Sequence, residues 1–360
     1  MLLATVLLIQ GQALAPLTSG GTTAPTPQVE KTVTIFGRLQ SDFTLSGAAG
    51  DEDASAVEFR RVRIGAKGNL SAAASYKVEL DFASSSSPAK FADAYLQLKN
   101  IGPGAIKIGH FKEPFGLDEL TSSRFITFME RSVVSGFAPA RNHGIMMSNS
   151  TEELTWQAGT FWDADAYGED SDADNNTSLG ARVVYRPWVT DKGRTLLHLG
   201  ASLQKRDGTK AFKAYPGSHE SGSWSTTLTN ADTTGLELAY TDGPLSLMGE
   251  YASTDSDEGE ATAKSAQVSW FMGDQFRGYK TSSAAFERTK GASEGAWELA
   301  ARWGDYDFSA VAGGNSGQAK GVAVNWYVDS NTRVMVDSTT VEPEGAENYS
   351  VMAVRFAFDF

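Results

Sequence analysis

The chain has 360 residues and a formal charge of −13 at pH 7. Its hydrophobic content of 41% excludes a chain that is disordered throughout. It has no cysteine, which excludes a disulfide framework and a thiolate metal site. Beyond the N-terminus no apolar run reaches the roughly 18 residues that a membrane helix needs, so any membrane crossing would have to be made by strands.

The N-terminus predicts an export signal followed by a linker. Residues 1–15, MLLATVLLIQGQALA, have an apolar core that ends in the small-residue pattern Ala13-Leu14-Ala15. The alternative is a short buried helix. Residues 16–31 are rich in Pro, Thr and Gly and predict a linker, so the main domain is expected to span residues 32–360.

From Thr32 onwards apolar and polar residues alternate with period 2, which is the pattern of β-strands. In the first such segment Val33 and Ile35 share one face, and Arg38 lies on the other. The alternation recurs in the segments 75–83, 104–111, 178–186, 195–204, 234–240, 243–251, 296–303, 321–328, 331–339 and 350–360. Generous boundaries give about 16 strands, an even number as outer-membrane barrels require.

A soluble sandwich would also alternate, so the tryptophans and the loops decide between it and a membrane barrel. Five tryptophans lie at or near strand ends on the apolar face, as in an interfacial girdle: Trp156, Trp270, Trp297, Trp303 and Trp326. The connections divide into tight turns and long acidic or Gly-rich loops, which is typical of outer-membrane barrels. We therefore predict an all-β fold, a closed transmembrane antiparallel barrel of about 16 strands.

The last segment, 350–360, supports a closed barrel. It is strongly amphipathic, carries Arg355 and Asp359 on its polar face and ends on Phe360. An open edge of this kind would recruit other chains, whereas a closed barrel has no edge. We expect the strand that ends at Phe360 to pair with the strand that begins near Thr32, with its aromatic face against lipid.

No catalytic or cofactor site is predicted, and the histidines form no metal-binding motif. The histidines are scattered, with no HExxH motif and no paired spacing: His110, His143, His198 and His219. A barrel hydrolase would need a nucleophile beside a base, and no Ser/His pair stands out. Nothing in the sequence indicates a nucleic-acid partner.

Several sequence blocks, taken in order, resemble the phosphate- and polyphosphate-selective porin O and P family of the bacterial outer membrane. They are FGRLQSDF (36–43), FRRVRIGAKGNL (59–70), YKVELDFA (76–83), FADAYLQLK (91–99), IKIGHFKEPFGLDELTSSRFITFMERS (106–132), GAWELAARW (295–303) and VNWYVDSNTRVMVD (324–337). The resemblance covers the chain from about Thr32 to Phe360, and Phe360 itself resembles the signal read by the outer-membrane assembly machinery.

The resemblance implies a fold, a location and partners. The fold is a 16-stranded homotrimeric barrel whose third external loop, here residues 112–142, folds into the lumen as a constriction. The location is the bacterial outer membrane, with lipid and lipopolysaccharide around the barrel. The solutes are small anions, phosphate or polyphosphate, and no cofactor is implied.

The resemblance also assigns charged residues to the constriction. They are Arg38, Arg60, Arg61 and Arg131, with Asp93 as an acidic neighbour. Arginine suits phosphate because its planar fork donates two hydrogen bonds at once. Strict alternation would point Arg60 at lipid, so either a bulge turns it inward or it lies near the interface; we favour the bulge.

Three further loop residues are expected at the constriction. Ser122 and Ser123 offer hydroxyl donors, and Arg124 offers another charge. Outside the constriction, family members carry a ladder of external arginines, and the matching stretch here, 204–221, offers only Lys205, Arg206, Lys210 and Lys213. We therefore expect a weakened basic ladder.

The acidic residues lie mainly in the second part of the chain. From Asn142 to Phe360 there are 17 Lys and Arg against 31 Asp and Glu. The stretches 163–174 and 255–260 are either solvated acidic loops or divalent-cation sites at the lipopolysaccharide surface. The expected function is passive diffusion of anions through a water-filled pore. The alternatives are a general or weakly selective porin of the same fold, and a structural or adhesive barrel plugged by its own loop.

Overall fold

The computed structural model describes residues 30–48, 51–83, 89–165, 176–291 and 294–360. The predicted signal at 1–15 and nearly all of the predicted linker at 16–31 lie outside the described residues, and so does most of the acidic stretch at 163–174. These predictions stay predictions.

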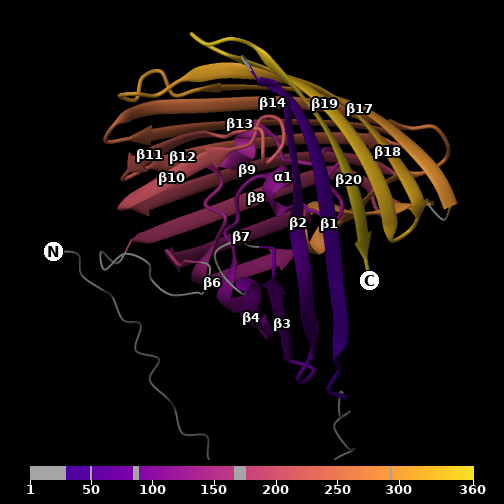
Figure 1. The fold of residues 1–360 in the computed structure, drawn as a ribbon. Coiled ribbons are helices and arrows are strands. Elements are labelled where there is room, and N and C mark those ends of the chain that lie inside the picture. The colour runs from indigo at the N-terminus through magenta and orange to yellow at the C-terminus, as the bar shows by residue number, and fades with distance from the viewer. Residues whose placement is uncertain (1–29, 49–50, 84–88, 166–175, 292–293) are drawn as a thin grey trace, which may run out of the picture.

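Sixteen strands of the described chain form one closed antiparallel barrel (Figure 1). In barrel order they are β1 (Thr34–Ala48), β2 (Asp51–Asn69), β3 (Ala74–Asp81), β4 (Lys90–Ile101), β5 (Gly104–Lys112), β6 (Arg141–Ser150), β7 (Leu154–Trp162), β8 (Thr177–Thr190), β9 (Thr195–Asp207), β12 (Asp232–Asp242), β13 (Leu245–Ser256), β14 (Gly259–Phe271), β17 (Glu294–Asp307), β18 (Ser316–Asp329), β19 (Thr332–Pro343) and β20 (Tyr349–Asp359). The predicted fold is confirmed.

The last strand closes the barrel on the first. β20 pairs with β1 in a register that runs from Arg38 opposite Asp359 to Gly47 opposite Ser350. Phe360 extends this ladder, because its N–H and C=O exchange hydrogen bonds with Gly37 at 3.2 and 3.1 Å. A Cβ on Gly37 would lie 2.5 Å from the Phe360 ring, so the close approach requires glycine at this position. The closure expected from the aromatic end of the sequence is confirmed.

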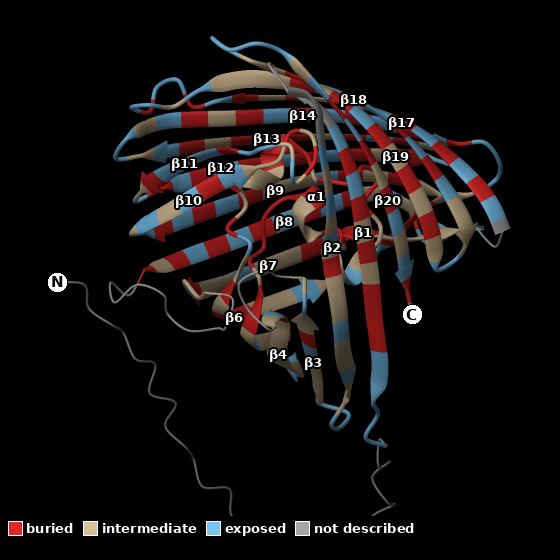
Figure 2. Cartoon of the chain, in the orientation of Figure 1, coloured by how far each residue is buried: buried red, intermediate tan, exposed pale blue. Residues whose placement is uncertain are grey.

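The two faces of the barrel differ in polarity. Exposed apolar side chains such as Phe43 and Phe356 cover the outer face, where their rings meet edge to face at 5.9 Å. Side chains such as Arg355 are buried on the inner face, and Figure 2 shows buried and exposed residues alternating along the strands. An apolar band outside and a polar lumen inside are what a membrane-spanning barrel needs. No helix among the described residues is long and apolar enough to span a membrane.

Tryptophans line one rim of the outer face. Trp188, Trp270, Trp297 and Trp326 are exposed, and the rings of Trp297 and Trp326 are stacked 5.8 Å apart. This is the rim at which β20 ends and the short turns 102–103, 151–153, 243–244 and 330–331 lie. Short turns are typical of the periplasmic end, so we assign this rim to the periplasm and the opposite end to the exterior.

The third external connection folds into the lumen, as expected. Residues 113–140, called the inward loop below, contain α1 (Leu117–Leu120) and the 3-10 helix η1 (Val133–Phe137). The backbone N–H of Leu117 donates to Glu250 of β13 at 2.7 Å. The N–H of Met129 donates to Asp337 of β19 at 2.6 Å. Both strands are far from β5 and β6 around the barrel, so the loop crosses the lumen.

A second segment enters the lumen from the periplasmic end and was not predicted. Between β14 and β17 lie β15 (Phe276–Lys280), η2 (Thr281–Ser283) and β16 (Ala285–Lys290), called the inner hairpin below. The Tyr279 hydroxyl hydrogen-bonds Nδ1 of His198 on β9 at 2.7 Å, and Leu117 shares a buried apolar cluster with Tyr279 and Phe286. The inner hairpin and the inward loop therefore pack together.

The fifth external connection, residues 208–231, carries a small hairpin of its own. β10 (Thr209–Ala214) pairs with β11 (Trp224–Thr229). Its Phe212 meets Phe137 of η1 at 5.8 Å, and Trp224 stacks on Tyr306 of β17 at 3.6 Å. This external loop thus packs on the inward loop from the exterior side.

Candidate functional site

A cationic cavity of about 760 Å³ lies between the inner faces of β1–β6, the inward loop and the inner hairpin. Of the described residues, fourteen basic side chains line it: Arg38, Arg60, Arg61, Arg63, Lys67, Lys77, Lys107, Lys112, Arg124, Arg131, Arg141, Lys280, Arg288 and Lys290. Four acidic side chains line it: Glu79, Asp93, Glu119 and Glu287. The lining therefore has the opposite sign to the whole chain, whose net charge is −13.

The wall and the inward loop meet at Arg38. Nη1 of Arg38 donates to the hydroxyl of Ser123 at 2.8 Å and to that of Ser122 at 3.3 Å, and Nη2 forms an ion pair with Glu79. The Gln40 side chain adds a hydrogen bond to the Ser123 carbonyl at 3.0 Å. The predicted wall arginine and the two predicted loop serines are thus in direct contact.

A bulge in β2 turns Arg60 and Arg61 to the same side. Gln40 pairs with Arg61 and Ser41 pairs with Phe59, so Arg60 is left without a partner residue in the ladder. This is the bulge that we favoured from the alternation.

The two arginines have different partners. Arg60 donates to both carboxylate oxygens of Glu130 at 2.8 and 2.9 Å, a bidentate pair that the sequence did not predict. Arg61 donates to the Gln40 side chain at 2.8 Å and has no carboxylate partner among the described residues.

Arg131 lies at the cavity but is engaged by the inward loop itself. It donates to the carbonyls of Asp118 and Thr121 at 2.8 and 2.7 Å and pairs with Glu119 at 3.2 Å. Burial would raise the pKa of Glu119, but Arg131 and Lys112 outweigh it and lower that pKa to about 2. Glu119 is therefore ionised at neutral pH, and Arg131 fixes the end of α1.

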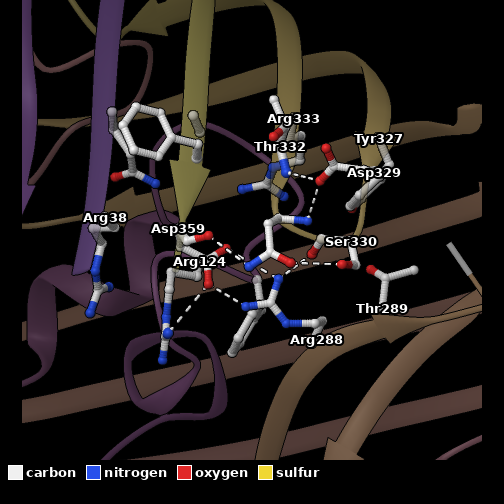
Figure 3. Close-up of a pocket in the computed structure, with 15 residues that line it drawn as sticks. Arg38, Arg124, Arg288, Thr289, Tyr327, Asp329, Ser330, Thr332, Arg333 and Asp359 are labelled. Carbon is white, nitrogen blue, oxygen red and sulfur yellow. Dashed lines mark hydrogen bonds and ion pairs between the residues drawn. The ribbon is translucent and has the colours of Figure 1, made fainter. Parts of the chain in front are cut away.

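The other predicted charges are also paired. Asp93 on β4 bridges Lys77 and Arg141, the latter at 2.8 Å. Arg124 approaches Asp359 at 3.4 Å, and Arg288 of the inner hairpin pairs with the same carboxylate. Figure 3 shows both guanidinium groups directed at Asp359 in a pocket of about 30 Å³ at the periplasmic end.

Four cations of the cavity lining have no carboxylate partner among the described residues: Arg61, Lys67, Lys107 and Lys280. Nζ of Lys107 lies 4.7 and 5.0 Å from the ring centroids of Tyr95 and Phe111, and Nζ of Lys67 lies 5.4 Å from that of Phe36. The strand alternation would have placed Lys67 and Lys107 in the lumen, whereas Lys280 belongs to the hairpin that was not predicted.

The four residues of the expected basic ladder do not form a continuous row of basic side chains leading into the lumen. Lys205 is exposed on the outer face and pairs with Asp232 at 3.2 Å, so the structure does not bring it to the lumen. Arg206 points inward but pairs with Glu113 and Asp163. Of the other two, Lys210 lies 3.8 Å from Asp163, and Lys213 lies over the Tyr215 ring at 4.9 Å.

Sequence and structure comparisons identify the family. The family model described as phosphate-selective porin O and P matches residues 33–360. The chain belongs to this family. It is 25% identical to Porin O of Pseudomonas aeruginosa, over 88% of this chain and 84% of that protein. These findings, with the barrel, make the protein an outer-membrane porin.

Solved porin structures share the fold. An anion-selective porin from Comamonas acidovorans matches with a TM-score of 0.58 and 14% identity, covering 92% of this chain and all of that one. OprB of Pseudomonas putida matches with a TM-score of 0.60 and 10% identity, covering 92% of this chain and 94% of that one. The family and the fold indicate a channel rather than an enzyme.

Proposed function

We propose that this porin is a passive, water-filled channel for small anions, phosphate or polyphosphate, and that the cationic cavity is its selective part. The observation that carries the proposal is the excess of basic over acidic side chains in that lining, together with its four unpaired cations. Fixed charges at a narrow point set the selectivity of a pore, and nearby charges outweigh diffuse surface charge of the other sign. The net charge of −13 is therefore compatible with anion passage.

The cavity offers the donors that a phosphate needs. Arg61 presents a guanidinium that forms no ion pair with a described carboxylate, and Nε of Arg38 is buried without a hydrogen-bond partner among the described residues. Guanidinium groups bind phosphate oxygens through paired hydrogen bonds, whereas Lys67 and Lys107 add point charges. Conduction also requires that binding stay weak enough for release. The ion pairs of Arg38 and Arg60 lower the positive electrostatic potential of the cavity. A bound anion is therefore held less tightly and can leave.

The second candidate is a general or weakly selective porin of the same fold. It is favoured by the pairing of the other ten basic lining residues with carboxylates and by the outward position of Lys205. The two candidates predict different currents, since only a selective cavity retains anions strongly enough for phosphate to compete with chloride.

Planar-bilayer recording of the purified protein tests the proposal. Under a tenfold KCl gradient we expect a reversal potential whose sign is that of the chloride equilibrium potential. We also expect added phosphate to block the chloride current in a saturable way. A reversal potential near zero without phosphate block would leave the general porin as the function.

We also propose that the protein is a homotrimer in outer-membrane lipid and lipopolysaccharide. The apolar outer face supports the membrane setting, and OmpT of Vibrio cholerae, which shares the fold with a TM-score of 0.55, is described in a trimer form. Native mass spectrometry of the detergent-solubilised protein measures the number of chains directly.

A further inference from the structure

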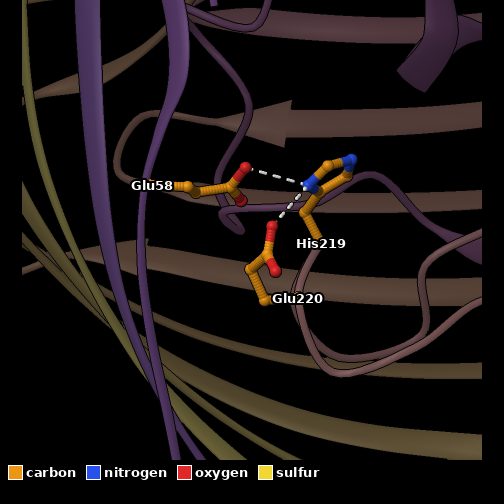
Figure 4. Close-up of side chains that lie close together, drawn as sticks. All are labelled: Glu58, His219 and Glu220. Carbon is orange, nitrogen blue, oxygen red and sulfur yellow. Dashed lines mark hydrogen bonds and ion pairs between the residues drawn. The ribbon is translucent and has the colours of Figure 1, made fainter. Parts of the chain in front are cut away.

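Two distant segments bring three metal-ligand side chains together at the external mouth (Figure 4). Glu58 comes from β2, whereas His219 and Glu220 come from the fifth external loop. Nδ1 of His219 lies 2.9 Å from Oε2 of Glu58 and 3.4 Å from Oε1 of Glu220. Because Glu58 and His219 are 161 residues apart, no sequence spacing could reveal this cluster.

The separations fit a metal centre. Zinc binds histidine nitrogen and carboxylate oxygen at about 2.0–2.2 Å in a tetrahedral arrangement, so its ligand atoms lie about 3.3–3.6 Å from one another. The three ligand atoms here all lie within 4.8 Å of one another. Small side-chain rotations would therefore bring all three to bonding distance.

A second observation also points to a ligand. Oε1 of Glu58 is buried and has no hydrogen-bond partner among the described residues. A buried carboxylate oxygen is seldom left unsatisfied, and an ion between the three side chains would satisfy it. One histidine and two carboxylates, with room for water at a fourth position, are a suitable donor set for Zn²⁺.

We propose that Glu58, His219 and Glu220 bind one divalent transition-metal ion per chain, with Zn²⁺ as the fitting metal. The site fastens the fifth external loop to the barrel wall. The loop is already held nearby, because Thr44 of β1 donates to the Ser218 hydroxyl at 3.1 Å.

The metal site adjoins the cationic cavity. The Tyr215 ring lies 4.7 Å from the His219 ring, and the Arg60 guanidinium lies 5.9 Å from the Tyr215 centroid. A bound divalent ion would also offset the charge of two carboxylates at the entrance. Metal binding by these three side chains can be measured whichever solute the channel conducts.

Zinc titration of the purified full chain by isothermal calorimetry tests the site. The protein is first treated with a chelator and dialysed into metal-free buffer at pH 7.5. We expect one Zn²⁺ per chain, bound at least tenfold more weakly by His219→Ala and by Glu58→Gln. Glu342→Gln is the matched control, because it removes an external carboxylate that pairs with Lys320 away from the cluster.

The outcomes separate the proposal from non-specific binding. Zinc affinity that is equal in the wild type and in His219→Ala would overturn the site, since any zinc would then be bound elsewhere. No zinc binding by the wild type would overturn it as well. Glu220→Gln provides an independent variant on an exposed loop side chain, so the test does not rest on the folding of Glu58→Gln alone.

Discussion

Arg61→Gln is expected to weaken phosphate binding more than the loss of a comparable charge outside the cavity. Arg61 is only 4% exposed, lines the cavity and forms no ion pair with a carboxylate among the described residues, so its replacement removes a cation that is not held in an ion pair there. Glutamine is polar, and Gln40 keeps its separate hydrogen bond to the Ser123 carbonyl, so the barrel should assemble normally.

The magnitude follows from the position of the charge. Two unit charges 4 Å apart attract each other by about 1 kcal/mol in water and by about 4 kcal/mol at an effective dielectric constant of 20. The lower figure alone corresponds to roughly a fivefold change in affinity. We therefore expect the phosphate concentration that halves the chloride current to rise at least about fivefold.

The assay is the chloride current of single channels as phosphate is added. Lys320→Gln is the matched control, because it removes the same formal charge from an exposed residue that pairs with Glu342. Arg61→Lys keeps the charge but loses the fork, so it should retain chloride preference better than phosphate block. Equal block in Arg61→Gln and Lys320→Gln would refute the assignment of Arg61 to the selective cavity.

Three other variants test the inward loop and the closure of the barrel. A cysteine at Ser122, which is more exposed to the cavity than Ser123, should react with small thiol reagents and lower the conductance; unchanged current after confirmed labelling would contradict an inward loop in the pore. Arg131→Ala loses hydrogen bonds to two carbonyls, each worth about 1.5–3 kcal/mol, so protease should cut the inward loop faster while the barrel stays folded; an unchanged cleavage rate would argue against this anchoring. Deletion of Phe360 removes the ladder bonds to Gly37 and should reduce assembly, measured as the heat-modifiable fraction on gels, whereas wild-type yield would count against the closing role.

The barrel and its closure could be predicted because they depend on a periodic signal. Every strand must show apolar side chains to lipid and polar ones to the lumen, so the alternation in the sequence reports the fold directly. The bulge could be predicted because the resemblance places both Arg60 and Arg61 in the lumen, whereas strict alternation would point Arg60 at lipid. The inward course of the third connection was predicted from the resemblance, and the length of this loop fits a functional role.

The partners of the charged side chains could not be predicted, because loops have no such period. Glu130 lies next to Arg131 in the sequence, yet it is Glu130 that reaches Arg60, while Arg131 turns back to α1. One feature of the sequence could have indicated the inner hairpin. Short and long connections alternate along the chain, and 272–293 is a long connection at a position where a short turn is expected. Counting connections from the first strand would have revealed it.

The proposed selectivity depends on which cations of the lumen remain unpaired rather than on how many there are. A cavity lined by fourteen uncompensated charges would be destabilised by mutual repulsion and would hold anions too tightly to release them. Ion pairs with carboxylates reduce both the repulsion and the excessive binding of anions. Glu130 of the inward loop forms such ion pairs with Arg60 and, at 3.1 Å, with Arg355. The arginine–carboxylate pairs thus fix the position of the loop, whereas in the proposed function Arg61 and the three unpaired lysines supply the attraction for anions. The same arrangement explains how a chain with an excess of acidic residues can form an anion channel.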